Sequence, residues 1–174
     1  MNKRFMLSVA GVSAAAIASS ALADITVHVD WVTLLGTEGA SVDLGEVSGT
    51  LTGLSYSYAW VNDTGDSSWS SDMLIGVSAG SAVVSVGGYN YGLSGSFWGG
   101  LNGSAADGTY SGYASGAMGM SGNGTFQWIN GWTGSAGTTS TIYATLHGIN
   151  AVPAPAAIAL LGLAGVAGTR RRRH

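Results

Sequence analysis

Glycine is the residue that most limits what this chain can fold into. Of the 29 glycines, all but Gly11, Gly162, Gly165 and Gly168 lie between residues 24 and 150. Glycine is among the weakest helix formers, whereas the Ser, Thr, Val, Tyr and Trp around it suit strands. The six tryptophans and seven tyrosines argue against disorder, because they supply enough aromatic surface for a core. The sequence therefore predicts a folded β domain over residues 24–150.

Alternation of apolar and polar residues predicts where the strands lie. Residues 54–60 alternate most cleanly and place Leu54, Tyr56, Tyr58 and Trp60 on one face. Seven further strands are predicted over residues 25–31, 73–77, 82–86, 89–98, 110–120, 125–129 and 141–149. Glycines within 110–120 suggest bulges or an edge strand there, and dipeptides such as Asn123-Gly124 are typical of turns. About eight short strands without a helical period predict an all-β fold, an antiparallel sandwich or jelly roll.

The first 23 residues have the features of a secretory signal helix. Lys3 and Arg4 precede an apolar stretch over residues 5–17, and Ala21-Leu22-Ala23 forms a small-x-small cleavage site. Signal peptidase is expected to cut between Ala23 and Asp24. A retained N-terminal anchor is the alternative, but the apolar stretch is short for a membrane span.

The last segment, residues 151–174, has three parts. Val152-Pro153-Ala154-Pro155 holds the chain extended, because proline cannot donate a backbone hydrogen bond. An apolar stretch follows and predicts a hydrophobic transmembrane helix, its members including Ala156, Leu160, Leu161, Leu163 and Val166. The terminal Arg170, Arg171, Arg172 and Arg173 are expected to act as a cytoplasmic stop, because clustered positive charge stays on the inner side of a membrane. A buried core helix with a solvated tail is the alternative.

This tail resembles the PEP-CTERM sorting signal of Gram-negative bacteria, in which a Pro-Glu-Pro motif precedes a transmembrane helix and an Arg-rich end. The resemblance covers residues 152–173 and departs at one position, where Ala154 replaces the usual Glu. It implies transient insertion in the inner membrane and processing by an exosortase-type enzyme. In the middle of the chain, residues 71–84, 124–128 and 143–148 are similar to strands of P-domain-like jelly rolls.

The distribution of charge excludes one class of partner. The six basic residues, Lys3, Arg4 and Arg170–Arg173, all lie in the terminal segments, whereas the nine acidic residues lie between Asp24 and Asp107. A domain without Lys or Arg cannot neutralise phosphates, so nucleic-acid binding is excluded. Divalent cations are the natural partners of such an acidic surface. The chain has no cysteine, which rules out disulfides, thiolate metal sites and a cysteine nucleophile.

One loop has the composition of a calcium site, and no other cofactor is expected. Residues 62–72 carry Asp63, Asp66 and Asp72 around a glycine, and closely spaced oxygen ligands suit Ca²⁺. The loop lacks the full EF-hand pattern, and a solvated turn is the alternative reading.

Signals for catalysis are sparse, and the chain is not expected to be an enzyme. His28 and His147 are the histidines of the middle region, and neither belongs to a catalytic spacing motif. Aromatic residues offer another role, because exposed rings can stack on sugars. The aromatic residues considered for this role, with core packing as the alternative, are Tyr89, Tyr91, Phe97, Trp98, Trp128 and Trp132.

Together these features predict an exported protein of the bacterial cell surface or extracellular matrix. Its expected role is structural or adhesive, in a surface layer, a biofilm or an exopolysaccharide matrix. Signal peptidase and an exosortase-type enzyme are its expected processing partners, and exopolysaccharide its expected ligand. A carbohydrate-binding module is the second hypothesis, favoured by an exposed aromatic strip. A secreted hydrolase is the third, favoured by groups that converge on His147.

Overall fold

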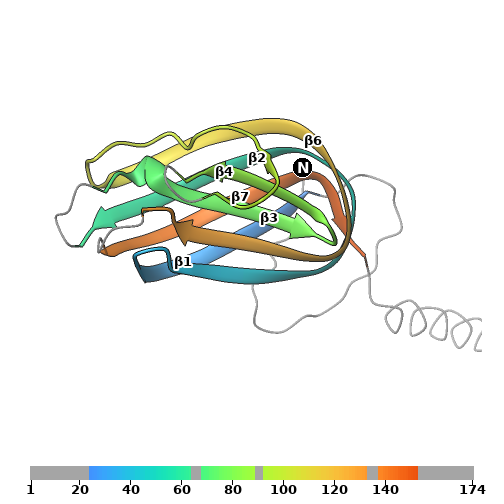
Figure 1. The fold of residues 1–174 in the computed structure, drawn as a ribbon, viewed down its shortest axis with the longest axis horizontal. Helices are drawn as coiled ribbons and strands as arrows, with labels where there is room; N and C mark the ends of the chain where they lie inside the picture. The colour runs from blue at the N-terminus through green and yellow to red at the C-terminus, as the bar shows by residue number, and fades with distance from the viewer. Residues whose placement is uncertain (1–23, 64–67, 89–91, 133–136, 153–174) are drawn as a thin grey trace, which may run out of the picture.

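A computed structural model describes residues 24–63, 68–88, 92–132 and 137–152 of the chain. These residues form one mixed sheet of seven strands in the order β1-β7-β2-β6-β3-β4-β5 (Figure 1). The strands are β1 (Ile25–Leu35), β2 (Gly39–Asn62), β3 (Met73–Ala79), β4 (Ala82–Gly87), β5 (Ser96–Phe97), β6 (Gly108–Asn130) and β7 (Gly137–Ala151). A 3-10 turn, η1 (Ser70–Asp72), precedes β3. Within these ranges the all-β prediction is confirmed.

The sheet folds over on itself because its two longest strands bend. The later part of β2 lies between β7 and residues 108–115 of β6, whereas its earlier part, residues 39–49, pairs chiefly with residues 120–129 of β6. Pairing shifts register near Gly53 in β2, where the two strands curve together (Figure 1). We call β1, β7 and the adjoining parts of β2 and β6 the first layer. The second layer comprises the remaining parts of β2 and β6 with β3, β4 and β5.

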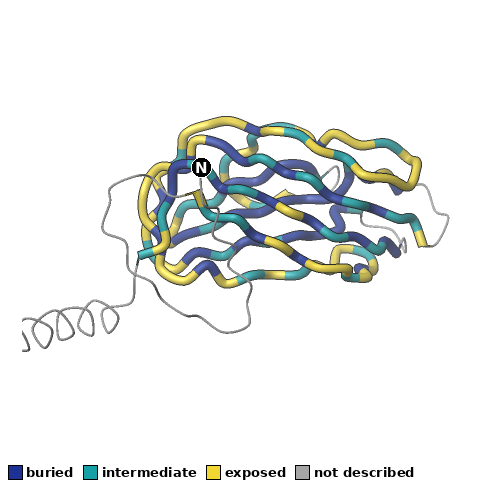
Figure 2. Tube along the Cα trace, turned by 180° about the vertical axis from the view of Figure 1, so that it is seen from behind, coloured by how far each residue is buried: buried dark blue, intermediate teal, exposed yellow. Residues whose placement is uncertain are grey.

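The inner faces of the two layers meet in the core. Trp128 of the second layer donates its ring N–H to the Ser140 hydroxyl of β7 at 2.8 Å, although their strand segments are not paired with each other. The Trp128 ring also lies 5.2 Å from that of Tyr58, between ring centroids. Leu54, Tyr56, Tyr58 and Trp60 are all buried, as their alternation predicts. Figure 2 shows buried and exposed residues alternating along these strands.

Several strand predictions are confirmed in place. Residues 25–31, 54–60, 73–77, 82–86 and 141–149 all lie in strands, and β3 and β4 form a hairpin around Gly80. The residues 108–115 of β6 pair with β2 alone and a register shift follows them. The glycines in this segment were predicted to mark bulges or an edge strand, and the structure has both features here.

Other expectations are wrong. Asn123-Gly124 is not a turn, because both residues are paired within β6, which joins two predicted strands into one. Residues 39–50 form a strand that the pattern does not predict, since a register shift between Asp43 and Gly45 breaks the alternation. Of the predicted strand 89–98, only Ser96–Phe97 is a strand among the described residues. The two flanking helices were predicted over segments that lie outside the described ranges.

The two described ends of the chain lie at the same end of the sandwich. Ile25 at the start of β1 pairs with Leu146 near the end of β7, because the two strands are antiparallel. The sheet bend lies at this end too, because Gly49 of β2 pairs with Ile149 near the end of β7. The turn between β3 and β4 lies at the same end in Figure 1. No helix in the described part of the chain is long and apolar enough to cross a membrane.

Candidate functional site

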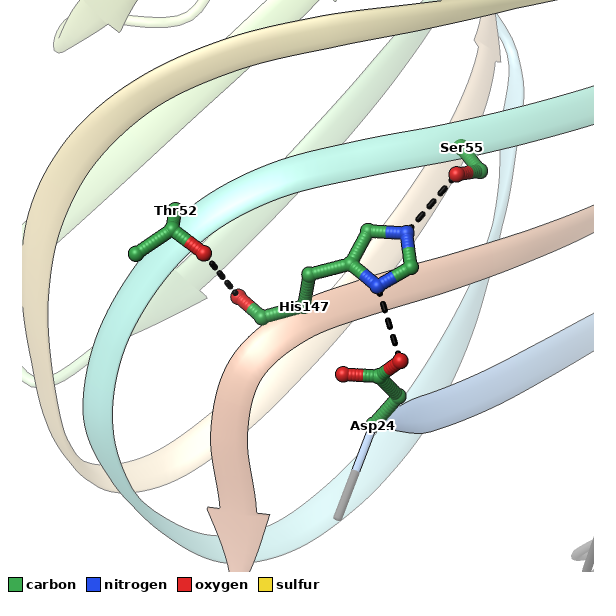
Figure 3. A network of polar contacts seen from close by, with 4 residues as sticks. All are labelled: Asp24, Thr52, Ser55 and His147. Carbon is green, nitrogen blue, oxygen red and sulfur yellow. Dashed lines mark hydrogen bonds and ion pairs between the residues drawn. The ribbon is translucent and has the colours of Figure 1, made fainter. Parts of the chain in front are cut away.

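Three polar side chains from neighbouring strands form a continuous chain of hydrogen bonds on the outer face of the first layer. His147 of β7 lies between the Asp24 carboxylate, at the start of β1, and the Ser55 hydroxyl of β2 (Figure 3). The distance from His147 Nδ1 to Asp24 Oδ2 is 2.8 Å, and that from His147 Nε2 to Ser55 Oγ is 2.7 Å. We call these three residues the Ser55 network.

The order of strands in the sheet explains why these residues meet. β7 lies between β1 and β2, and His147 pairs with Gly53 of β2. Side chains alternate across a strand, so Ser55 lies on the same face as Gly53, one step further along β2. The Thr52 hydroxyl also donates to the His147 carbonyl oxygen at 3.3 Å and ties the backbone of β7 to β2.

The chemistry of the partners sets the direction of the hydrogen bonds. An ionised carboxylate can only accept, so His147 Nδ1 must carry the proton that it donates to Asp24. In a neutral imidazole the other nitrogen, Nε2, is then an acceptor, and Ser55 donates its hydroxyl proton to it. This arrangement orients a serine hydroxyl toward a base that is itself oriented by a carboxylate.

Solvent reaches this network from the outer face. The His147 side chain is 29% exposed and the Asp24 side chain 45% exposed. Tyr113 of β6 pairs with Ser55 across the ladder, and its ring centroid lies 5.9 Å from that of His147. The Tyr113 ring occupies the space over Gly53, where a Cβ would overlap its hydroxyl. Because position 53 is a glycine, the Tyr113 ring has room to lie beside His147.

We call three exposed aromatic residues on the strands of the first layer the aromatic strip. Trp31 of β1 is 55% exposed, Tyr143 of β7 49% and Tyr113 of β6 60%. The Tyr143 ring stacks on His28, with centroids 4.0 Å apart and planes at 6°. The three aromatic residues of the strip come from three strands of the first layer, interspersed with hydroxyl and carboxylate groups.

This strip differs from the aromatic residues considered from sequence. Trp128 is fully buried, which confirms the alternative of core packing for this residue, and Trp98 is partly buried against the core. Phe97 is exposed but lies on β5, in the second layer. Tyr89 and Tyr91 lie outside the described residues. The pattern misses the strip because each of its members looks like an ordinary strand residue.

The three predicted calcium ligands have separate roles where the structure describes them. Asp63 accepts a hydrogen bond from the Thr139 hydroxyl, and Asp72 accepts one from the Trp69 backbone N–H at 2.8 Å. Burial raises the pKa of Asp72, an effect that the Trp69 hydrogen bond opposes. Asp66 lies outside the described residues, and within them no three His, Cys, Asp or Glu side chains gather as a metal site. The calcium site stays a prediction.

The sequence-predicted processing residues lie mostly beyond the described ranges. Asp24 and Val152 are described, and Val152 donates its backbone N–H to the Glu46 carbonyl oxygen at 2.7 Å. Ala21 and Ala23, Pro153 to Pro155, the apolar residues Ala156 to Val166, and Arg170 to Arg173 lie outside. Asp24, expected as the first residue of the mature protein, is thus also a member of the Ser55 network.

Comparison with known proteins found no matching family model, curated protein or solved structure.

Proposed function

We propose that this chain is an exported bacterial protein of the cell surface or extracellular matrix, with a structural and adhesive role in an exopolysaccharide matrix. The observation that carries the adhesive role is the exposed aromatic strip of Trp31, Tyr143 and Tyr113. Aromatic rings offer apolar faces for sugar rings, and adjacent hydroxyl groups offer hydrogen-bond partners. Exposed aromatic surface is a common feature of ligand-binding faces.

The proposed ligand is a neutral or cation-bridged polysaccharide. The domain has no Lys or Arg between Phe5 and Thr169, so it offers no side-chain cation to an anionic sugar other than a protonated histidine. An acidic polymer would therefore need Ca²⁺ between the two surfaces, which links this proposal to the predicted calcium loop.

The proposed export route rests on the terminal segments. A leader cut after Ala23 and an exosortase-type cut near Pro153-Ala154-Pro155 would together remove every Lys and Arg of the chain. We expect the protein recovered from the surface of its host to begin at Asp24 and to lack Arg170 to Arg173. Intact-mass spectrometry of the recovered protein measures both ends, and a protein that retains the four arginines contradicts the processing proposal.

Binding to polysaccharide should depend on the aromatic strip. We expect the mature protein, purified after export, to bind selected glycans on an array or to co-sediment with an insoluble polysaccharide. Trp31→Ala and Tyr143→Ala should each weaken binding roughly tenfold, as expected for loss of a central aromatic contact.

Phe97→Ala is the matched control for these variants, because Phe97 is also exposed but lies in the other layer. It should leave binding unchanged. The adhesive proposal is contradicted by a protein that binds no glycan with or without Ca²⁺, or by equal losses in all three variants.

A further inference from the structure

The Ser55 network has the arrangement that activates a serine hydroxyl for attack on a carbonyl carbon. We propose that Ser55 is a nucleophile, His147 its general base and Asp24 the residue that positions His147, and that the site removes O-acyl groups from the bound polysaccharide. The substrate class rests on the proposed function, whereas the reactivity of Ser55 rests on the geometry alone.

The distances in the network fit proton transfer. A base must lie within about 2.6–3.2 Å of the group whose proton it takes, and the Ser55 Oγ to His147 Nε2 distance of 2.7 Å meets this condition. Asp24 holds the proton on Nδ1, so that Nε2 faces Ser55 with its lone pair. The carboxylate also stabilises the imidazolium that forms when the proton moves.

A donor for the developing oxyanion must come from a side chain. Ser55 is paired on both sides, with Thr145 of β7 and Tyr113 of β6. Its backbone N–H and C=O groups are therefore used in the hydrogen bonds of the sheet. The Tyr113 hydroxyl, held over Gly53, has no hydrogen-bond partner among the described residues and points along the face that carries Ser55 and His147. Tyrosine is one of the side chains that fill this role.

The reaction balances in two steps. The Ser55 oxygen bonds to the carbonyl carbon of an O-acyl ester while His147 takes its proton and passes it to the departing sugar oxygen, which leaves as a hydroxyl. Water then attacks the acyl-serine, gives one proton to His147, and releases the carboxylic acid as Ser55 recovers its proton. The net change is ester and water to alcohol and acid.

The position of the network on the outer face of the sheet determines which esters can reach Ser55. The network lies on the solvent-facing side of a sheet with its side chains part-exposed, so an acyl group carried on an extended polymer has access. Tyr113 of the aromatic strip lies beside His147, and the strip would hold the sugar backbone against the network. A single side-chain donor for the oxyanion predicts slow turnover, since each such donor contributes substantially to rate.

The test combines covalent labelling with ester hydrolysis, using the mature full domain purified after export. A fluorophosphonate probe should label the wild-type protein at Ser55, as located by peptide mass spectrometry, and p-nitrophenyl acetate should be hydrolysed above the buffer rate. Neither probe needs the sugar site, so these results are independent of glycan binding. An O-acetylated polysaccharide, with released acetate measured, then tests the substrate class separately.

Variants assign the roles. Ser55→Ala should abolish labelling, and Ser55→Ala and His147→Asn should each lower hydrolysis by about a hundredfold or to the buffer rate. Tyr113→Phe should lower it roughly tenfold without loss of labelling. Asp24→Asn should lower it because the imidazole loses its oriented tautomer, and Asp24→Glu should restore part of the rate, which a merely structural hydrogen bond would not do.

Ser57→Ala is the matched control, because Ser57 lies two residues along β2 on the same face and outside the network. It should match wild type in labelling and hydrolysis, and thermal melts should show every variant folded. The proposal is overturned if folded wild-type protein is not labelled, or if Ser55→Ala hydrolyses the ester as fast as wild type does.

Discussion

Replacing Trp128 by alanine is expected to lower the free energy of unfolding by about 3–5 kcal/mol. Trp128 is fully buried between the layers, where its ring packs against Tyr58 and its N–H bonds to the Ser140 hydroxyl at 2.8 Å. The substitution leaves a cavity and deprives a buried hydroxyl of its partner. Domains of this kind are stable by only about 5–15 kcal/mol, so the variant should be near the limit of folding.

Chemical denaturation followed by near-ultraviolet circular dichroism measures this effect. Trp31→Ala removes the same side chain from an exposed position and should change stability by no more than about 0.5 kcal/mol. Equal losses in the two variants would show that the contacts between layers do not dominate the stability.

Gly148→Ala is expected to cost about 2 kcal/mol or more, because two independent effects oppose a side chain there. Gly148 has a φ of 87°, a conformation that side chains strain, and an added Cβ would overlap the Thr50 carbonyl oxygen. Its neighbour across the bend is equally constrained, since a Cβ on Gly49 would lie 2.6 Å from the Gly148 carbonyl oxygen. These two glycines let the strands approach closely where the sheet folds over.

Gly119→Ala provides the control for the bend. Gly119 of β6 pairs with Thr50 beside the bend, yet an added Cβ at Gly119 meets nothing within 4 Å and its φ is not in the left-handed range. It should be neutral or slightly stabilising, because alanine restricts the unfolded chain more than glycine does. Urea unfolding of both variants decides the matter: a neutral Gly148→Ala would mean that the bend relaxes to accept a side chain.

Local patterns were enough to predict much of the sheet. The alternation at Leu54 to Trp60 identifies an inward face, and the predicted strands 73–77 and 82–86 lie within β3 and β4. Local patterns fail where the pairing is irregular. The early part of β2 contains a register shift after Asp43, and β6 passes through Asn123-Gly124 without turning, because its pairing with β2 continues on both sides.

The candidate site could not be predicted in the same way, because it depends on which strands become neighbours. Ser55 and His147 are 92 residues apart, and Asp24 and His147 are 123 apart. No local spacing joins them, and each alone resembles a polar residue on the outer face of a strand. The one available signal is the alternation of residues along β7, which places His147 on the outer face. The residues that alternate with the buried ones are Thr141, Tyr143, Thr145 and His147.

The antiparallel pairing of β1 with β7 has a consequence for how the domain would be presented to its surroundings. Asp24 and Val152 leave the sandwich at the same end, together with the sheet bend, whereas β2 ends at Asn62 and β6 at Asn130, at the opposite end. If the leader and the tail both enter the inner membrane, two segments attach the precursor to the membrane, and both join the same end of the sandwich. Whichever of the two segments is cut first, the other keeps the same end of the sandwich facing the membrane. The order of the two processing events therefore does not change which loops face outward.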